Sequence, residues 1–283
     1  MERYYRFAGV ELTVSMPEAR AYTDEHHLAP FAVDSVTDPH VFRFEIVETL
    51  TEPTGVCIAD DPVFRVYEDG GTCIRYIGSA DAYIRVCRQG QMNDVQLLAK
   101  SYPGCIGSKT VLNSIAAEHL IARAGGFVFH CSYIDWGGMA ILFTAPSQTG
   151  KSTQAELWRS LRGAQIINGD RAAVRIADGA ALAEGIPFAG SSDYCLNRTL
   201  PLAAVVYLGQ APVTTIRRMR GYEAFARIWE GVSVNAWDRE DVSLVSDAVK
   251  RVAESIPVYH LPCTPDESAV IALENALKKE GRP

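Results

Sequence analysis

The chain has 283 residues, of which 48% are hydrophobic and 22% charged, a composition typical of a soluble globular protein with one large domain or two smaller ones. Its 27 basic and 34 acidic residues give a net charge of −7, which disfavours a general nucleic-acid binder. Seven scattered cysteines never form C-x-x-C, which disfavours a zinc site or a disulfide framework. The N-terminal residues lack a signal peptide's apolar core, and no apolar run approaches the length of a membrane span. We therefore expect a cytoplasmic protein with no nucleic-acid or membrane partner.

The first hundred residues consist of short β-patterned runs separated by turn residues. Asp69-Gly70-Gly71 lies between two of these runs and predicts a hairpin. We expect a β-rich N-terminal domain over residues 1–104. Its predicted strands are Arg3–Val14, Val41–Val47, Val63–Tyr67, Thr72–Ile77, Ala82–Cys87 and Val95–Ala99.

After Pro103-Gly104 the pattern changes, and residues 105–283 are expected to form a second domain of the α/β class. Val111–Arg123 has apolar residues at helical spacing and is predicted to be one helix. Residues 127–135 and 139–144 look like the two strands of a hairpin around Gly137-Gly138. The remaining predicted strands are Gln165–Asn168, Ala172–Ile176, Ala203–Leu208 and Val213–Arg217, and the remaining helices are Tyr222–Trp229, Asp238–Ser255 and Pro265–Lys279.

Residues 145–153 read Ala-Pro-Ser-Gln-Thr-Gly-Lys-Ser-Thr, between an apolar run and a helix-like segment. This is the phosphate-binding P-loop pattern G-x-x-x-x-G-K-[ST], with Ala145 in place of the first glycine. Gly150 allows a tight turn that points backbone N–H groups at phosphate oxygens, Lys151 can reach the β- and γ-phosphates, and the Ser152 hydroxyl can ligate Mg²⁺. The alternative is an ordinary strand-to-helix turn. The pattern predicts a site for ATP and Mg²⁺ formed by Ser147, Gln148, Thr149, Gly150, Lys151, Ser152 and Thr153.

A P-loop needs a carboxylate to complete its metal site, and transfer to a hydroxyl usually needs a base. Asp170 is the best candidate for both, because it follows a predicted strand 19 residues beyond Lys151. It can ligate Mg²⁺ together with Ser152, or accept the proton of the nucleophile. His130, in a predicted apolar strand, can contact phosphate or tune Asp170, or it can be a hydrogen-bonded core residue.

The segment 184–198 is rich in small and polar residues, as binding loops often are. Arg198 is a candidate for neutralising charge on the transferred phosphoryl group. Ser191, Ser192 and Asp193 are candidates for contacts with phosphate or substrate, and a plain surface connection is the alternative for each of them. His119 and His260 are predicted to be structural.

The stretch from Phe129 to Arg198 resembles the HPr kinase and phosphoenolpyruvate carboxykinase superfamily. The members carry a His-containing strand, a Gly turn, an apolar strand, the P-loop and an Asp-Asp-Arg run. Here these are His130, Gly137-Gly138, Met139–Thr144, Ala145–Thr153 and Gly169-Asp170-Arg171. The resemblance implies an HPr-kinase-like P-loop core with a mixed sheet, in which Lys151, Ser152 and Thr153 bind phosphates and Mg²⁺.

Two features depart from the family pattern. Gly169 replaces the first aspartate of the pair, so that one carboxylate must do the work of two, and the C-terminal signature of HPr kinases is not visible. The chain resembles instead the divergent members, some of which phosphorylate peptides in natural-product gene clusters. HPr itself is not the expected substrate, and a homo-oligomer is allowed because relatives often assemble.

The leading hypothesis is an ATP- and Mg²⁺-dependent kinase that phosphorylates a Ser or Thr hydroxyl of a peptide or small protein. In this hypothesis Asp170 positions or deprotonates the acceptor, Arg198 or His130 stabilises transition-state charge, and the N-terminal domain recognises the acceptor or covers the site. The alternative is a nucleotide-binding sensor or scaffold without turnover, which Ala145 and Gly169 would favour. A carboxykinase acting on oxaloacetate is less well supported, since no arginine arrangement suits a dicarboxylate.

Overall fold

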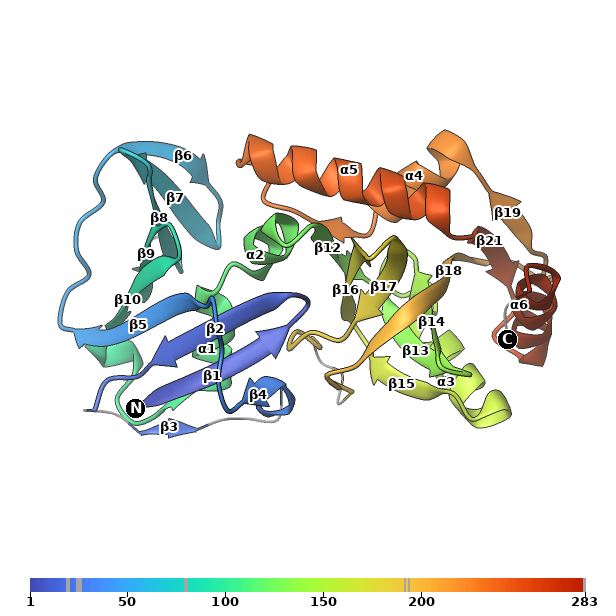
Figure 1. Ribbon diagram of the computed structural model, residues 1–283, viewed down its shortest axis with the longest axis horizontal. Coiled ribbons are helices and arrows are strands. Elements are labelled where there is room, and N and C mark those ends of the chain that lie inside the picture. The colour runs from blue at the N-terminus through green and yellow to red at the C-terminus, as the bar shows by residue number, and fades with distance from the viewer. Residues whose placement is uncertain (19–20, 24–26, 79–80, 191, 193, 282–283) are drawn as a thin grey trace. The chain divides into compact units, whose positions relative to one another are not determined.

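The computed structural model describes residues 1–18, 21–23, 27–78, 81–190, 192 and 194–281 (Figure 1). The chain forms two compact units, Met1–Ala117 (unit 1) and Glu118–Pro283 (unit 2). The sequence-based division at residue 104 therefore differs from the structure by 13 residues. Residues 105–117 belong to unit 1 because β11 (Ile106–Gly107) pairs with β3 (Tyr22–Thr23).

Unit 1 is β-rich, as the sequence predicts. Its main sheet has the strand order β4-β1-β2-β5-β10-β9-β8-β7-β6. β5 pairs in parallel with β2 and with β10, and the other neighbours are antiparallel. The strands are β1 (Glu2–Phe7), β2 (Val10–Ser15), β4 (Ala32–Val33), β5 (His40–Val47), β6 (Val56–Asp60), β7 (Phe64–Asp69), β8 (Thr72–Ile77), β9 (Ile84–Gln89) and β10 (Met92–Leu98), and short 3₁₀ helices span Ala29–Phe31 and Ala99–Ser101.

Turn residues fix the hairpins of unit 1. Asp69 pairs with Thr72 across Gly70 and Gly71, both at positive φ, which confirms the hairpin predicted there. The predicted strand Arg3–Val14 is instead two strands, because Ala8 and Gly9 have φ of 49° and 73° and reverse the chain. Left-handed backbone of this kind cannot continue a strand.

The helix predicted over 111–123 is also two elements, α1 (Ser108–Ser114) and α2 (Ala117–Arg123). Ala116 between them has a φ of 40°, outside the helical region. The Ser114 carbonyl accepts a hydrogen bond from the Arg75 guanidinium of β8, and the Ser114 hydroxyl donates to the Thr110 carbonyl at 2.8 Å. Apolar spacing continues across the break, which is why the sequence did not reveal it.

Unit 2 is built around a mixed sheet of the order β15-β13-β14-β18-β17-β16-β12-β20, with β21 pairing β18 and β19. β14 pairs in parallel with β18, and β18 with β21, whereas β13 is antiparallel to β14. Trp136 faces Met139 across Gly137-Gly138, which confirms the predicted turn. The strand predicted over 127–135 is instead two strands, β12 and β13, of which only β13 pairs with β14. The strands are β12 (Gly126–His130), β13 (Ser132–Trp136), β14 (Met139–Thr144), β15 (Gln165–Asn168), β16 (Arg171–Ala177), β17 (Ala180–Glu184), β18 (Thr199–Gln210), β19 (Arg217–Met219), β20 (Val232–Ser233) and β21 (Val258–Cys263).

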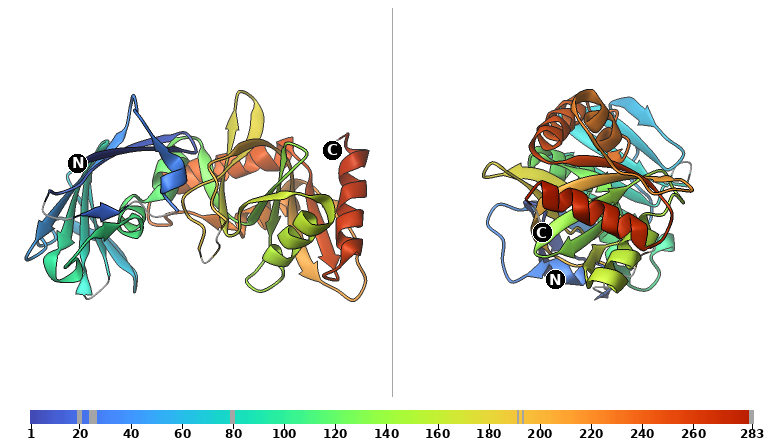
Figure 2. Two further views of the ribbon diagram at one scale, coloured as in Figure 1. Left: turned by 90° about the horizontal axis from the view of Figure 1, so that it is seen from below. Right: turned by 90° about the vertical axis from the view of Figure 1, so that its right-hand side faces the viewer.

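Helices cover both faces of this sheet. Successive residues of β14 alternate between two buried clusters, with Ala140 and Leu142 in one and Ile141 and Phe143 in the other. The first cluster includes α5 (Arg239–Ser255) and α4 (Gly221–Trp229), and the second includes α3 (Lys151–Arg162) and α6 (Glu267–Lys279). Figure 2 shows α3 and α6 side by side, and the two helices are in contact. Unit 2 is therefore a three-layer α/β/α arrangement.

Capping residues set the starts of the two long helices. The Asp238 side chain accepts hydrogen bonds from the Glu240 and Asp241 amides, and Asp266 accepts one from the Ser268 amide. These contacts satisfy amides that have no partner within the helix.

The strand predicted over 213–217 is wrong, since β19 begins only at Arg217. Among the described residues, none of the helices has both the length and the apolar character needed to cross a membrane.

Candidate functional site

The loop between β14 and α3 has the backbone that its glycine requires. Gly150 lies at the N-cap of α3 with a φ of 116°, a conformation strained for any residue with a side chain. Gln148 also has a positive φ, of 64°, in the sparsely populated left-handed region. Ala145 does not need glycine's freedom, because its φ is not positive and its side chain is buried in the cluster with Phe143 and Trp158.

The first turn of α3 is open to a ligand. Its N-cap, Gly150, has no side chain that could bond the leading amides of the helix. Lys151 donates from Nζ to the carbonyl of Ala145 at 3.1 Å, which holds the ammonium group over the loop. Burial lowers the pKa of Lys151, and the nearby charge of Asp170 opposes that shift. Free amides and a partly desolvated ammonium together form a good anion site.

Asp170 lies where the chain passes from β15 to β16, and backbone contacts hold it there. The Cys131 amide donates to the Asp170 carbonyl at 3.0 Å. The Asn168 Oδ1 atom accepts hydrogen bonds from the amides of Asp170 and Arg171, both at 2.9 Å. Asn168 itself is fully buried.

His130 and Arg171 flank the Asp170 carboxylate. His130 Nε2 is 3.5 Å from Asp170 Oδ1, and Arg171 Nε is 3.3 Å from Oδ2. The contact with His130 lowers the pKa of Asp170 below its ordinary value, and the charges of Arg171 and Lys151 lower it further. Asp170 is therefore a charged carboxylate at neutral pH, which suits it to bind a cation more than to act as a strong base.

His130, Lys151 and Asp170 line one cavity of about 540 Å³, which we call the P-loop cavity. This volume is within the range of about 300–1,000 Å³ that is usual for small-molecule sites. Of the predicted site residues, the structure brings together Ser147, Gln148, Gly150, Lys151, Ser152, Thr153, His130 and Asp170 in its lining. Ser192 lines it as well, whereas Ser191 and Asp193 lie outside the described residues.

Two predicted site residues are placed elsewhere. Thr149 does not line the P-loop cavity, and its amide donates to the Pro146 carbonyl at 3.3 Å. Arg198 pairs with Asp135 at 2.8 Å. Asp135 is near the Gly137 turn, at the opposite end of the β13–β14 hairpin from the P-loop, so Arg198 is not positioned to contact a group in the cavity.

Sequence reasoning did not propose five residues of the lining, namely Ser132, Ala155, Glu156, Ile166 and Tyr194. Glu156 and Tyr194 are the two of these that interact with each other across the cavity wall. The Tyr194 hydroxyl donates to Glu156 Oε1 at 3.1 Å, which connects the 185–198 segment to α3. Glu156 lies four residues after Ser152 on the same helix, so helical spacing could have identified it as a second carboxylate facing the site. No local pattern marks Tyr194, because its place depends on the path of a loop.

The structure leaves little room for a side chain at residue 169, where a second aspartate would precede Asp170. A Cβ atom at this position would lie 2.2 Å from Ser192 Oγ and 2.7 Å from Ser192 Cβ. Gly190 is similarly close to the Asp170 carboxylate, because a Cβ atom added at Gly190 would lie 2.8 Å from Asp170 Cγ. Ser192 therefore occupies the space that a side chain at residue 169 would need.

The donor set fits a nucleotide phosphate with Mg²⁺. The uncapped amides and Lys151 suit phosphate oxygens, and the Asp170 carboxylate and Ser152 hydroxyl are the hard oxygen ligands that Mg²⁺ prefers. Ser152, Lys151 and Asp170 line the same cavity, and the charges of Lys151 and Asp170 influence each other there.

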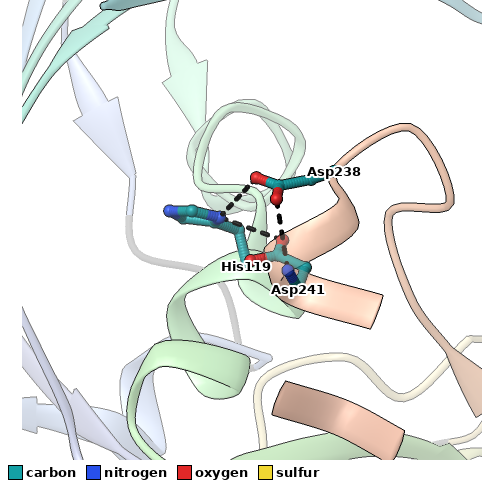
Figure 3. Close-up of side chains that lie close together, drawn as sticks. All are labelled: His119, Asp238 and Asp241. Carbon is teal, nitrogen blue, oxygen red and sulfur yellow. Dashed lines mark hydrogen bonds and ion pairs between the residues drawn. The ribbon is translucent and has the colours of Figure 1, made fainter. Parts of the chain in front are cut away.

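A second charged cluster lies outside this cavity. Figure 3 shows His119 of α2 facing Asp238 and Asp241 at the start of α5. His119 Nδ1 lies 3.7 Å from Asp238 Oδ2 and 3.0 Å from Asp241 Oδ2. The three offer ligand atoms within 4.8 Å of one another. The Arg123 guanidinium already lies 3.9 Å from Asp238 Oδ2 and 3.4 Å from Asp241 Oδ1, as ion pairs. The cluster is therefore an ion-pair network between helices, in agreement with the structural role expected for His119.

No protein-family model and no curated protein sequence matches this chain. Among solved structures, the chain is similar to the HPr(Ser) kinase/phosphatase from Coxiella burnetii, with 12% identity and a TM-score of 0.34. The match covers 54% of this chain and 93% of that one. This is a distant similarity, and at such a TM-score no conclusion about function rests on it.

Proposed function

We propose that the protein is an ATP- and Mg²⁺-dependent kinase that transfers the γ-phosphoryl group to a hydroxyl, a Ser or Thr of a peptide or small protein. The single observation that carries the proposal is the presence of Lys151, Ser152 and Asp170 in the lining of one cavity, at a glycine turn that leaves the first amides of α3 uncapped. A strand-to-helix turn with no ligand would not need a charged carboxylate opposite its lysine.

The roles follow from position and charge. The amides of the loop and Lys151 would hold the β- and γ-phosphates. Ser152 and Asp170 would hold Mg²⁺, which when bound neutralises charge on the transferred group. The acceptor oxygen would bond to the γ-phosphorus as the bond to the β–γ bridging oxygen breaks, leaving ADP.

His130 and Asp170 would control the proton of the acceptor. The low pKa of Asp170 makes it a weak base, so it would orient the hydroxyl and take its proton only as the new bond forms. His130, 3.5 Å from Asp170, would donate a hydrogen bond to phosphate or to that carboxylate. Arg198 has no part in this proposal, because Asp135 occupies its guanidinium.

The test is phosphoryl transfer from γ-labelled ATP with Mg²⁺ to a panel of short Ser- and Thr-containing peptides. Wild-type protein should label a peptide, and Asp170→Ala should lower the rate by at least about a hundredfold. Asp247→Ala is the matched control, because Asp247 is an aspartate of α5 that does not line the P-loop cavity.

The same experiment distinguishes a kinase from a protein that binds the nucleotide without turnover. Binding of Mg·ATP without transfer to any acceptor would favour a nucleotide sensor or scaffold. Absence of both binding and transfer would refute a nucleotide site at this loop.

A further inference from the structure

A second cavity, of about 560 Å³, opens on the other side of the P-loop. It shares Gln148, Gly150 and Thr153 with the P-loop cavity. The two cavities therefore meet at the loop and at the first turn of α3. A molecule whose phosphates lie at Gly150 would have the rest of its structure next to the second cavity.

The two cavities differ in chemistry. The P-loop cavity contains His130, Lys151 and Asp170, whereas the described residues that line the second include no charged side chain. Its walls are largely apolar and come from Leu208, Ala211, Pro212 and Pro265. Such a surface suits a flat, uncharged ring better than it suits a phosphate.

The Gln154 side chain has an oxygen that accepts no hydrogen bond from the described residues. This residue of α3 lines the second cavity and is only 3% exposed. Its Nε2 donates to Cys263 Sγ at 3.4 Å, while its Oε1 has no hydrogen-bond partner among the described residues. A buried carbonyl without a donor is costly, and an uncharged N–H group of a ligand would remove that cost.

A further amide connects the wall of the second cavity to the loop. Gln210, the last residue of β18, donates from Nε2 to the Gln148 carbonyl at 3.4 Å. Gln148 has the strained left-handed conformation described above. The contact joins the second cavity to the loop between β14 and α3.

We propose that the second cavity holds the base of the bound nucleotide, and that the Gln154 carbonyl accepts a hydrogen bond from the exocyclic amino group of adenine. This inference rests on the proposed nucleotide site but not on phosphoryl transfer. It assigns Gln154 as a residue that determines base specificity.

The test is calorimetric titration of the full chain, with Mg²⁺ present, with ATP, inosine triphosphate and inorganic tripolyphosphate. Inosine triphosphate has an oxygen where adenine has its amino group. Wild-type protein should bind ATP about three- to tenfold more tightly than inosine triphosphate, the effect of one hydrogen bond, and both more tightly than tripolyphosphate. Gln154→Leu should bind ATP and inosine triphosphate equally and leave tripolyphosphate binding unchanged.

A second variant tests the inference independently, in case Gln154→Leu does not fold. Ala211→Trp places a large side chain in the second cavity from its partly exposed wall, and it should weaken ATP binding at least tenfold without affecting tripolyphosphate. Ala180→Trp, at an exposed alanine of β17 outside both cavities, is the matched control and should bind all three probes as wild type does.

Different results would overturn the nucleotide site and the assignment of the base. Wild-type protein that binds none of the probes overturns the nucleotide site and the inference with it. Tripolyphosphate binding with no gain from a base overturns the inference alone. So does retention of the preference for ATP in a folded Gln154→Leu, or of full ATP affinity in Ala211→Trp.

Discussion

Replacement of Asn168 by alanine removes four hydrogen bonds at one buried point. The Asn168 side chain accepts from the Asp170 and Arg171 amides and donates to the carbonyls of Ile186 and Phe188, at 3.1 and 3.2 Å. It thereby joins the chain that carries Asp170 to the 185–198 segment. Since Asn168 is fully buried, water cannot replace the lost partners without opening the structure.

The expected loss of stability follows from these four bonds. A buried intramolecular hydrogen bond contributes about 1 kcal/mol, so the free energy of unfolding should fall by about 3 to 4 kcal/mol. This is at the upper end of single-substitution effects. With a urea dependence of about 3 kcal/mol/M, the midpoint should shift down by about 1 M.

Tryptophan fluorescence during urea unfolding measures this shift in unit 2. All four tryptophans of the chain, at 136, 158, 229 and 237, lie in unit 2. Where the variant is still folded, its affinity for Mg·ATP should fall at least tenfold, because Asp170 is no longer held in place.

Asn93→Ala is the matched control. Asn93 is also a buried asparagine, it donates to the carbonyls of Val41 and Gln91, and it belongs to unit 1. Its loss should destabilise unit 1 and leave Mg·ATP affinity unchanged. An unchanged urea midpoint in Asn168→Ala would refute the reasoning, since the four bonds would then contribute no net stability.

Three further predictions concern single side chains. Gly169→Ala should destabilise unit 2, because the added Cβ meets the Ser192 side chain. Adding Ser192→Gly should restore part of the lost stability in a double-mutant cycle measured by urea unfolding. Additive effects of the two substitutions would contradict the contact. Asp241→Asn should lower the free energy of unfolding by about 1 to 2 kcal/mol, because it removes a buried charge from the network while Arg123 keeps Asp238 and Glu240 as partners. It should leave Mg·ATP affinity intact, and lost affinity in folded protein would contradict a purely structural role. The folded-state pKa of Asp170 lies below its ordinary value of 3.8, so its charged form adds stability above about pH 4 that is lost as the pH falls below that value. The difference in melting temperature between wild type and Asp170→Asn should therefore shrink below about pH 4, and a constant difference down to about pH 2 would contradict the shift.

Local patterns in the sequence were sufficient for several elements. The Gly150-Lys151 turn between an apolar strand and a helix is visible as a motif, because its backbone conformation depends on neighbouring residues. The same holds for the helices predicted over 238–255 and 265–279, which the structure has as α5 and α6, and for the turn at Gly137-Gly138. Each of these features involves residues within a few positions of one another.

Features that depend on distant partners came only from the tertiary structure. The break at Ala116 accompanies a hydrogen bond from Arg75, and the segment with Tyr194 reaches Glu156 across 38 residues. The pairing of Arg198 with Asp135 removed a residue that composition alone had suggested for the site. The sequence predicted the P-loop and Asp170 separately. That both line one cavity depends on strand register and on buried hydrogen bonds. These form between segments whose separation along the chain carries no periodic signal.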